Sequence, residues 1–160
     1  MNAPRPRSTA RGQRGVYAIE FAMVFLIFFV LIYAAICYGL IFTLRFGLQN
    51  AAEDGARAAL RYQIDLPTRA AQAQTVATAS ASWLPAAVTL NATATVCQVA
   101  TNNCTAAVIS ACGITWATRC QMVVTVTASN MGRLLPPLPS FATPTQLTGQ
   151  ASMLLDTRTP

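Results

Sequence analysis

The sequence has no histidine and no lysine, and only five of its 160 residues are acidic. Without histidine it lacks the commonest general base and the commonest metal ligand of proteins. Four of the acids, Glu53, Asp54, Asp65 and Asp156, are scattered and do not form a spaced pair suited to acid–base catalysis. It also has no glycine-rich phosphate loop. We therefore expect no enzyme, no cofactor and no small-molecule substrate.

Positive charge is plentiful but concentrated at one end. All eleven cationic side chains are arginines, and four of them lie in residues 1–15, where no acid occurs. The rest of the chain has seven arginines against five acids, a formal charge of +2. Binding of nucleic acid needs a basic face on the folded part of a protein, so this class of partner is not expected.

Charged residues are absent from residues 21–44, which are mostly apolar. As a helix these 24 residues cover about 36 Å, more than the roughly 30 Å of hydrocarbon in a bilayer. The run is longer than the core of a signal peptide, and no A-x-A-like cleavage site follows it. The sequence therefore predicts a retained transmembrane helix in contact with membrane lipid.

The arginines around this span predict its orientation. Arg5, Arg7, Arg11 and Arg14 precede it, whereas Arg45 stands alone just after it. The excess of positive charge places the N-terminus in the cytoplasm and the C-terminal two thirds outside.

Beyond the span, the pattern predicts a small α+β domain. The helix should continue from about residue 16 to about 62, and Pro67 should separate it from a second helix over about 68–83. Alternation of apolar and polar residues then predicts strands in 87–99, 120–129 and 146–157, the first two with their even-numbered side chains facing in. We expect a three- to four-stranded antiparallel sheet whose even-numbered face packs on the helices, with any fourth strand in an insert at residues 100–118.

Four cysteines lie in the outer part of the chain, and a fifth, Cys37, lies within the span. The four are Cys97, Cys104, Cys112 and Cys120. An even number in an oxidising place predicts two disulfides, for which three pairings exist. A zinc site is the alternative, but the spacings of six, seven and seven residues lack the close pairs typical of thiolate zinc sites.

One carboxylate, Glu20, stands at the entrance to the span. Taken alone, it can be read as a charge tolerated at the inner membrane interface, because residues 21–44 are long enough to span without it. Yet the order of basic leader, Gly15, four residues, Glu20 and apolar helix resembles the class III signal of type IV-like prepilins. The resemblance implies that a prepilin peptidase cuts between Gly15 and Val16. It also implies that Glu20 then pairs with the freed amine of a neighbouring subunit during assembly.

A longer stretch, residues 11–62, resembles the TadE-like family. The shared features are Glu20-Phe21 after the glycine, Tyr38-Gly39 near the end of the span, and a block just outside it. The block consists of Asn50, Ala51, Gly55, Ala56 and Arg57. The resemblance implies a minor pilin or pseudopilin of the tight-adherence (Flp) pilus, in the bacterial inner membrane with a periplasmic domain. Its partners would be other pilin subunits and the pilus assembly platform. The four-cysteine insert departs from the family pattern.

Three glycines recur every eight residues along the long helix, at positions 39, 47 and 55. With Asn50 and Arg57 they are candidate packing residues, either against the protein's own outer domain or against sister subunits. The plainer reading is that Gly55 merely costs about 1 kcal/mol in a helix and that Arg57 is a solvated partner of Glu53.

The expected organisation is a cleaved leader at 1–15, a long helix at 16–62 and a periplasmic domain at 63–160. The rival function is that of an unprocessed single-pass anchor whose outer domain binds a ligand or a surface partner. The first residue of the protein isolated from cells distinguishes the two. Val16 indicates a processed pilin, whereas Met1 or Asn2 indicates the plain anchor.

Overall fold

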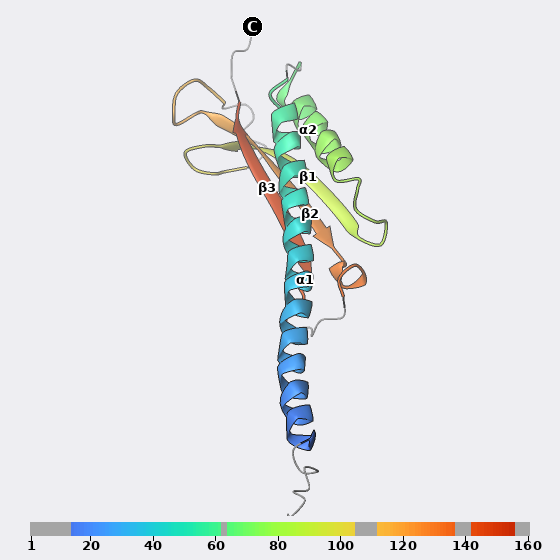
Figure 1. The fold of residues 1–160 in the computed structure, drawn as a ribbon. Helices are drawn as coiled ribbons and strands as arrows, with labels where there is room; N and C mark the ends of the chain where they lie inside the picture. The colour runs from blue at the N-terminus through green and yellow to red at the C-terminus, as the bar shows by residue number, and fades with distance from the viewer. Residues whose placement is uncertain (1–13, 62–63, 105–111, 137–141, 156–160) are drawn as a thin grey trace, which may run out of the picture. The chain divides into compact units, whose positions relative to one another are not determined.

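The computed structural model describes residues 14–61, 64–104, 112–136 and 142–155 (Figure 1). The elements are helix α1 (Arg14–Ala58), helix α2 (Leu66–Ser80), strands β1 (Thr89–Gln98) and β2 (Cys120–Ser129), the short 3-10 helix η2 (Met131–Arg133) and strand β3 (Gln146–Leu154). A long apolar helix, a second helix and a three-stranded antiparallel sheet confirm the predicted α+β class. The chain forms two compact units, Met1–Gly39 and Leu40–Pro160, which divide within α1.

The first unit contains the apolar part of α1. Its large side chains are exposed, from Val16 to Ile32 and beyond. By length and composition α1 can cross a membrane. The helix begins at Arg14, two residues before the predicted start, because nothing in residues 14–16 breaks helical backbone.

The second unit is built on a sheet in the order β1-β2-β3. Antiparallel pairing aligns Val124 of β2 with Ala94 of β1 and with Ala151 of β3. Apart from the disulfide-bonded Cys97, the buried positions are therefore even-numbered in β1 and β2, as predicted, but odd-numbered in β3, where Leu147 is buried. The prediction of a wholly even-numbered inner face was wrong for β3, because the register reverses the parity there.

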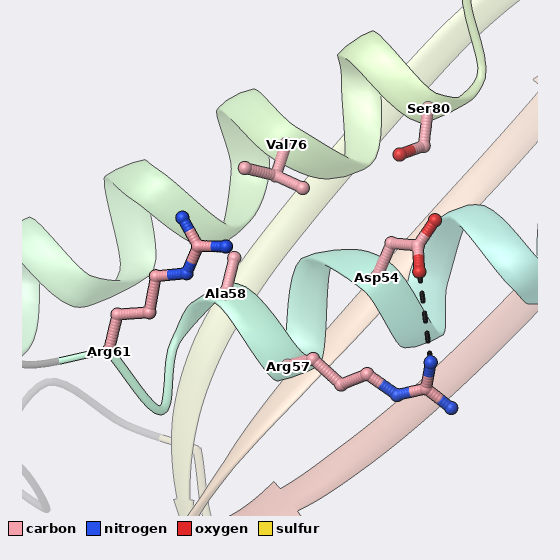
Figure 2. A pocket seen from close by; sticks show the side chains of 6 residues that line it. All are labelled: Asp54, Arg57, Ala58, Arg61, Val76 and Ser80. Carbon is pink, nitrogen blue, oxygen red and sulfur yellow. Dashed lines mark ion pairs between the residues drawn. The ribbon is translucent and has the colours of Figure 1, made fainter.

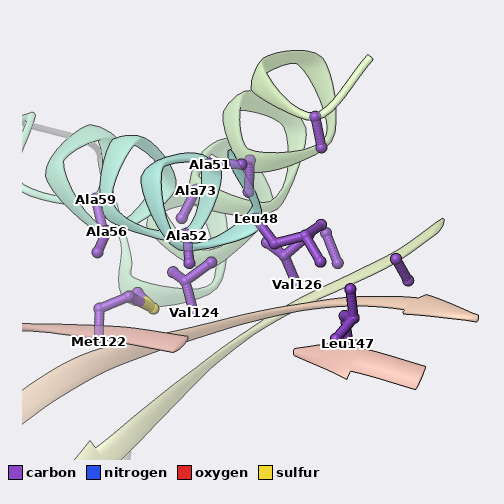
Figure 3. Close-up of a cluster of buried hydrophobic side chains, with 14 of the residues drawn as sticks. Leu48, Ala51, Ala52, Ala56, Ala59, Ala73, Met122, Val124, Val126 and Leu147 are labelled. Carbon is purple, nitrogen blue, oxygen red and sulfur yellow. The ribbon is translucent and has the colours of Figure 1, made fainter. Parts of the chain in front are cut away.

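Residues 40–58 of α1 and helix α2 lie on one face of this sheet (Figures 1 and 3). The helix side chains at this face are mostly alanines, and the strands supply valine, methionine and leucine. The labelled members of this core are Leu48, Ala51, Ala52, Ala56, Ala59, Ala73, Met122, Val124, Val126 and Leu147. Small side chains on the helices allow the three elements to approach closely, so the core is thin and densely contacted.

The ends of the helices differ from the prediction by a few residues, for local reasons. Asp65 is the N-cap of α2 and accepts a hydrogen bond from the backbone N–H of Thr68 at 2.7 Å, so α2 starts at Leu66 with Pro67 in its first turn. Helix α1 ends at Ala58, where the N–H of Leu60 bonds back to the Arg57 carbonyl at 3.1 Å in a tighter turn.

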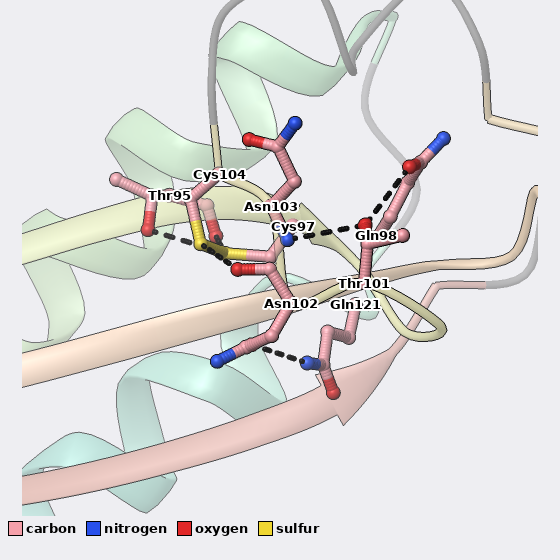
Figure 4. Close-up of a disulfide and its surroundings, with 8 residues drawn as sticks. All are labelled: Thr95, Cys97, Gln98, Thr101, Asn102, Asn103, Cys104 and Gln121. Carbon is pink, nitrogen blue, oxygen red and sulfur yellow. Dashed lines mark hydrogen bonds between the residues drawn. A yellow bond between two sulfur atoms is a disulfide. The ribbon is translucent and has the colours of Figure 1, made fainter.

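The prediction of two disulfides is confirmed, and the structure selects the pairing Cys97–Cys104 and Cys112–Cys120. Each bond closes a short loop at the same end of the β1–β2 pair, by joining a cysteine of a strand to one in the predicted insert. Around the first, Gln121 donates to Asn102 at 3.4 Å and the Thr101 hydroxyl donates to Gln98 at 3.1 Å (Figure 4). The described part of the insert, residues 99–104 and 112–119, contains no strand, so no fourth strand is found there.

Candidate functional site on helix α1

The bond expected to be cut lies in the first turn of α1. Gly15 and Val16 are both helical and exposed, and a Cβ built on Gly15 would meet no other atom within 4 Å. The first N–H groups of a helix have no partner within it, so this turn unwinds at low cost. A protease that binds its substrate in extended form can therefore reach the bond by unwinding one turn.

Glu20 lies four residues after Val16, on the next turn of the helix, and its side chain is exposed. The ion pairs found in the described part of the chain join Arg57 to Glu53 and Asp54, and none of them includes Glu20. A carboxylate on the exposed surface of an apolar helix is costly within hydrocarbon unless a cation from another molecule reaches it. The geometry thus leaves the Glu20 carboxylate available to a partner.

An aromatic ridge begins at the next residue. Phe21, Phe25, Phe29 and Tyr33 follow one another every four residues, with successive ring centroids 6.0, 6.3 and 6.4 Å apart. Side chains four residues apart are neighbours on a helix, so the rings form one continuous row. Such rows are the ridges by which helices pack into the grooves of other helices.

Two of the three periodic glycines lie at close contacts in the second unit. A Cβ on Gly47 would collide with the indole of Trp83, whose Cη2 atom would be 2.9 Å away. A Cβ on Gly55 would lie 2.8 Å from the carbonyl oxygen of Ala73 on α2. Real Cβ contacts this short are essentially never seen, so both positions require glycine for the observed packing. These contacts are made within the protein's own outer domain.

The remaining predicted packing residues lie elsewhere. A Cβ on Gly39 would meet no described atom within 4 Å. Asn50 is exposed, and Arg57 is exposed and lies 3.6 Å from Glu53 and 4.0 Å from Asp54. The structure therefore brings Gly47 and Gly55 to the interface between α1 and the domain, but places Asn50 and Arg57 on its surface.

Sequence reasoning missed the contact that ties α1 to the edge of the sheet. The Gln49 side-chain amide donates to the Gln150 carbonyl at 2.9 Å and accepts from the Gln150 N–H at 3.1 Å, as a neighbouring strand would. Beside it, a Cβ on Gly149 would lie 2.6 Å from the Gln49 nitrogen. A glycine inside a strand often marks such a close backbone approach, and that signal was present. Nothing in the sequence singles out Gln49.

A polar pocket of about 350 Å³ lies between α1 and α2 (Figure 2). Its lining residues are Asp54, Arg57, Ala58, Arg61, Val76 and Ser80. The carboxylate of Asp54 faces the guanidinium of Arg57, which is always charged and cannot act as a base. The pocket therefore holds an ion pair and not an acid–base couple.

Comparison with known proteins agrees with this arrangement. Residues 15–57 match the family described as TadE-like protein, which covers the exposed apolar helix and the Gly55 block. No curated protein and no solved structure matches the chain. The resemblance seen in the sequence is thereby confirmed for residues 15–57, which make up most of helix α1.

Proposed function

We propose that this protein is a minor pilin or pseudopilin that takes part in assembly of a tight-adherence (Flp) pilus. The observation that carries the proposal is the coincidence of three features at one point of the chain. The TadE-like match begins at Gly15, the exposed apolar helix extends from there, and Glu20 is exposed one turn later. A family match and a membrane-length helix fit a pilus-associated, pilin-like protein in the membrane.

In this proposal a prepilin peptidase cuts after Gly15 on the cytoplasmic side of the bacterial inner membrane. The new α-ammonium of Val16 lies at the positive end of a helix, where a neighbouring carboxylate is favoured. The Glu20 carboxylate of a sister subunit supplies that counter-charge, and low local dielectric strengthens the pair. The second unit then lies in the periplasm, consistent with its two disulfides. No catalytic role is assigned to any residue.

The N-terminal peptide of the protein isolated from its host tests the processing step. Mass spectrometry should find Val16 as the first residue in a host with the peptidase, and Met1 or Asn2 in a host without it. A Gly15→Leu variant should stay uncut, since a bulky side chain in place of glycine hinders entry into the cleft. Uncut wild-type protein from a host with a working pilus would support the plain membrane anchor instead.

Glu20 provides a separate test of assembly. Glu20→Ala should leave membrane insertion and cleavage unchanged but prevent the subunit from joining the assembly, whereas Glu20→Asp should retain part of it. Co-purification of tagged and untagged subunits after membrane extraction measures this step. Normal co-purification of the alanine variant would show that the carboxylate is only tolerated.

A further inference from the structure

Trp83 is an exposed tryptophan that lies against α1 just beyond the uncharged span. It follows α2 in a turn in which the Leu84 N–H donates to the Ala81 carbonyl at 3.2 Å. One edge of its indole packs on Gly47, yet Trp83 as a whole is 48% exposed. A tryptophan held in this way presents part of its ring to whatever surrounds the domain.

The exposed face of α1 at the same level is also aromatic. Phe42, Arg45, Phe46 and Gln49 line a cavity of about 250 Å³. Phe42 is 58% exposed and Phe46 is 69% exposed. Side chains three and four residues apart are neighbours on a helix, so Arg45 lies beside both phenylalanines. We refer to Phe42, Arg45, Phe46 and Trp83 as the aromatic surface.

Arg45 is the single charged residue of this region. No other charge occurs in residues 21–52 of α1 or in the turn at residues 81–88. The ion pairs among the described residues do not include Arg45. The aromatic surface therefore carries one positive charge among apolar side chains, and this charge attracts an anion from outside the protein.

The position along α1 determines what surrounds the aromatic surface. When the uncharged run 21–44 is centred on about 30 Å of hydrocarbon, with a rise of about 1.5 Å per residue, Arg45 and Phe46 lie about 4–5 Å beyond its edge. The headgroup layer is roughly 5–7 Å thick on each side, so both residues fall within it. Tryptophan is enriched at this level of a membrane, and a cationic side chain near the end of a span reaches the headgroups.

We propose that the aromatic surface binds an anionic phospholipid. The lipid phosphate lies on the Arg45 guanidinium, and the upper part of an acyl chain lies against the rings of Phe42 and Phe46. Trp83 lies in the same headgroup layer and gives the outer domain its own contact with the membrane. The inference rests on the membrane placement of α1 in the proposed function and adds a lipid site on the outer domain.

Lipid, and not a protein partner, is the occupant that the observations favour. The aromatic surface continues the row of exposed apolar side chains of α1, a helix long and apolar enough to cross a membrane. Phosphate is the anion that phospholipids present at the level of Arg45, and guanidinium binds it through paired N–H···O bonds. Anionic headgroups add a further attraction for a cation placed next to the span.

The chain has two tryptophans, so each can be studied alone in the full-length protein. Trp116→Phe leaves Trp83 as the fluorophore, and Trp83→Phe leaves Trp116 as the matched control. Each variant is reconstituted into vesicles of phosphatidylcholine and phosphatidylglycerol that contain lipid labelled with a nitroxide on the headgroup or with bromine deep in the acyl chain. The headgroup label should lower the Trp83 emission about twofold or more, and the deep label much less. Neither label should quench Trp116.

Trp116 is a suitable control because it is 67% exposed and precedes strand β2, whose start lies remote from the span. Leu48 of α1 lies beside the β3 partner of Val126, whereas Gly55, about two turns further from the span, lies beside Val124. Strand β2 therefore runs towards the level of the aromatic surface, and its ten residues span about 30 Å. A headgroup layer of roughly 5–7 Å that contains Trp83 leaves Trp116 outside it.

A second measurement tests the role of Arg45. In the Trp116→Phe protein, quenching of Trp83 by brominated phosphatidylglycerol is compared with quenching by brominated phosphatidylcholine. The ratio should be about two or more, should fall to about one in Arg45→Gln, and should be largely kept in Arg45→Lys, which retains the charge. Arg57→Gln is the matched control, because Arg57 belongs to the same helix but pairs with Glu53, and it should leave the ratio unchanged. Equal denaturant midpoints check that the variants remain folded.

The proposal is overturned if Trp83 is quenched no more than Trp116, or if the preference for phosphatidylglycerol persists in Arg45→Gln. It is also overturned if the quenching of Trp83 disappears as the protein density in the vesicles is raised, because a second copy then covers the surface. These outcomes are separable from those of the proposed function. Quenching of Trp83 in a protein that keeps Met1 would support the lipid site and contradict the processing, whereas a protein cut to Val16 without this quenching would keep the pilin function and lose the site.

Discussion

The two halves of helix α1 differ in the size of their side chains and in what surrounds them. Between residues 16 and 32 the large apolar side chains are exposed, with Phe21 at 70%. Between residues 51 and 59 the inward face is built of alanine and glycine, with Ala51 at 1%. One continuous helix therefore serves two environments, and the composition changes where the environment does.

The contrast teaches why large and small residues are used in different places. In hydrocarbon, large side chains favour insertion, and there is no backbone close by for them to strike. Against α2 and the sheet, large side chains would hold the backbones apart and leave voids between them. The two halves therefore differ in apolar content, since residues 48–59 include five polar or charged side chains, and also in the volume of their apolar side chains.

The largest expected loss of stability follows from a substitution at Gly149 of β3, which packs against the inward half of α1. Gly149→Ala forces a Cβ against the backbone of Leu48 and Gln49, which cannot rotate away. Overpacking against rigid neighbours costs about 1–3 kcal/mol and sometimes more, and we expect the upper end here. Thermal unfolding of the full-length protein in detergent, followed by near-ultraviolet circular dichroism, measures it. Gly132→Ala is the control, since its Cβ would meet nothing within 4 Å; equal stability of the two variants would contradict the observed contact.

Removing a disulfide should affect the second unit and leave the apolar half of α1 intact. Cys112→Ser with Cys120→Ser opens a short loop and should lower the stability of the second unit by about 2–3 kcal/mol. The helicity of the apolar half of α1 in detergent does not depend on this disulfide and should not change. Far- and near-ultraviolet circular dichroism, recorded together, separate the two signals. Simultaneous loss of both would show that the halves unfold as one.

A glycine-to-alanine pair on α1 sharpens the comparison within a single helix. Gly55→Ala gains about 1 kcal/mol of helix propensity but meets the Ala73 carbonyl at 2.8 Å, so we expect a net loss of about 1 kcal/mol. Gly39→Ala meets no described atom and should be neutral or slightly stabilising. Denaturant unfolding in one detergent compares them. A stabilised Gly55→Ala variant would mean that α2 moves aside easily.

The smallest effect concerns Asp65, at the start of α2. Hydrogen bonding to Thr68, through its side chain and its backbone N–H, lowers the pKa of Asp65 below its usual value. A lowered pKa in the folded state gives stability that is present above the unfolded pKa and is lost as the pH falls through the folded one. Asp65→Asn keeps a capping side chain but removes the titration. Its melting temperature should match the wild type at pH 7 within a few degrees and fall less steeply below pH 4, as followed by thermal unfolding across pH.

The sequence by itself determined the elements that depend on local pattern. Three features depend only on neighbouring residues: the uncharged run at 21–44, the apolar–polar alternation in β1 and β2, and the helix break near Pro67. The helices, the strands and the α+β class were therefore predictable. The prepilin-like order around Gly15 and Glu20 and the TadE-like block were also readable, because they are contiguous. The helix boundaries shifted by a few residues where local bonding decided the terminal turn, as at Asp65, which caps the first turn of α2.

Only the tertiary structure decided what lies far apart in sequence. The choice of cysteine pairs, the bonding of Gln49 to Gln150 and the burial of β3 on its odd-numbered side depend on register across the sheet. In the sequence Gly39, Gly47 and Gly55 looked alike. In the structure only Gly47 and Gly55 have no room for a Cβ, because Trp83 and Ala73 lie against them. A pattern along the chain records which face of an element is apolar, but the neighbour that meets this face is set by packing in three dimensions.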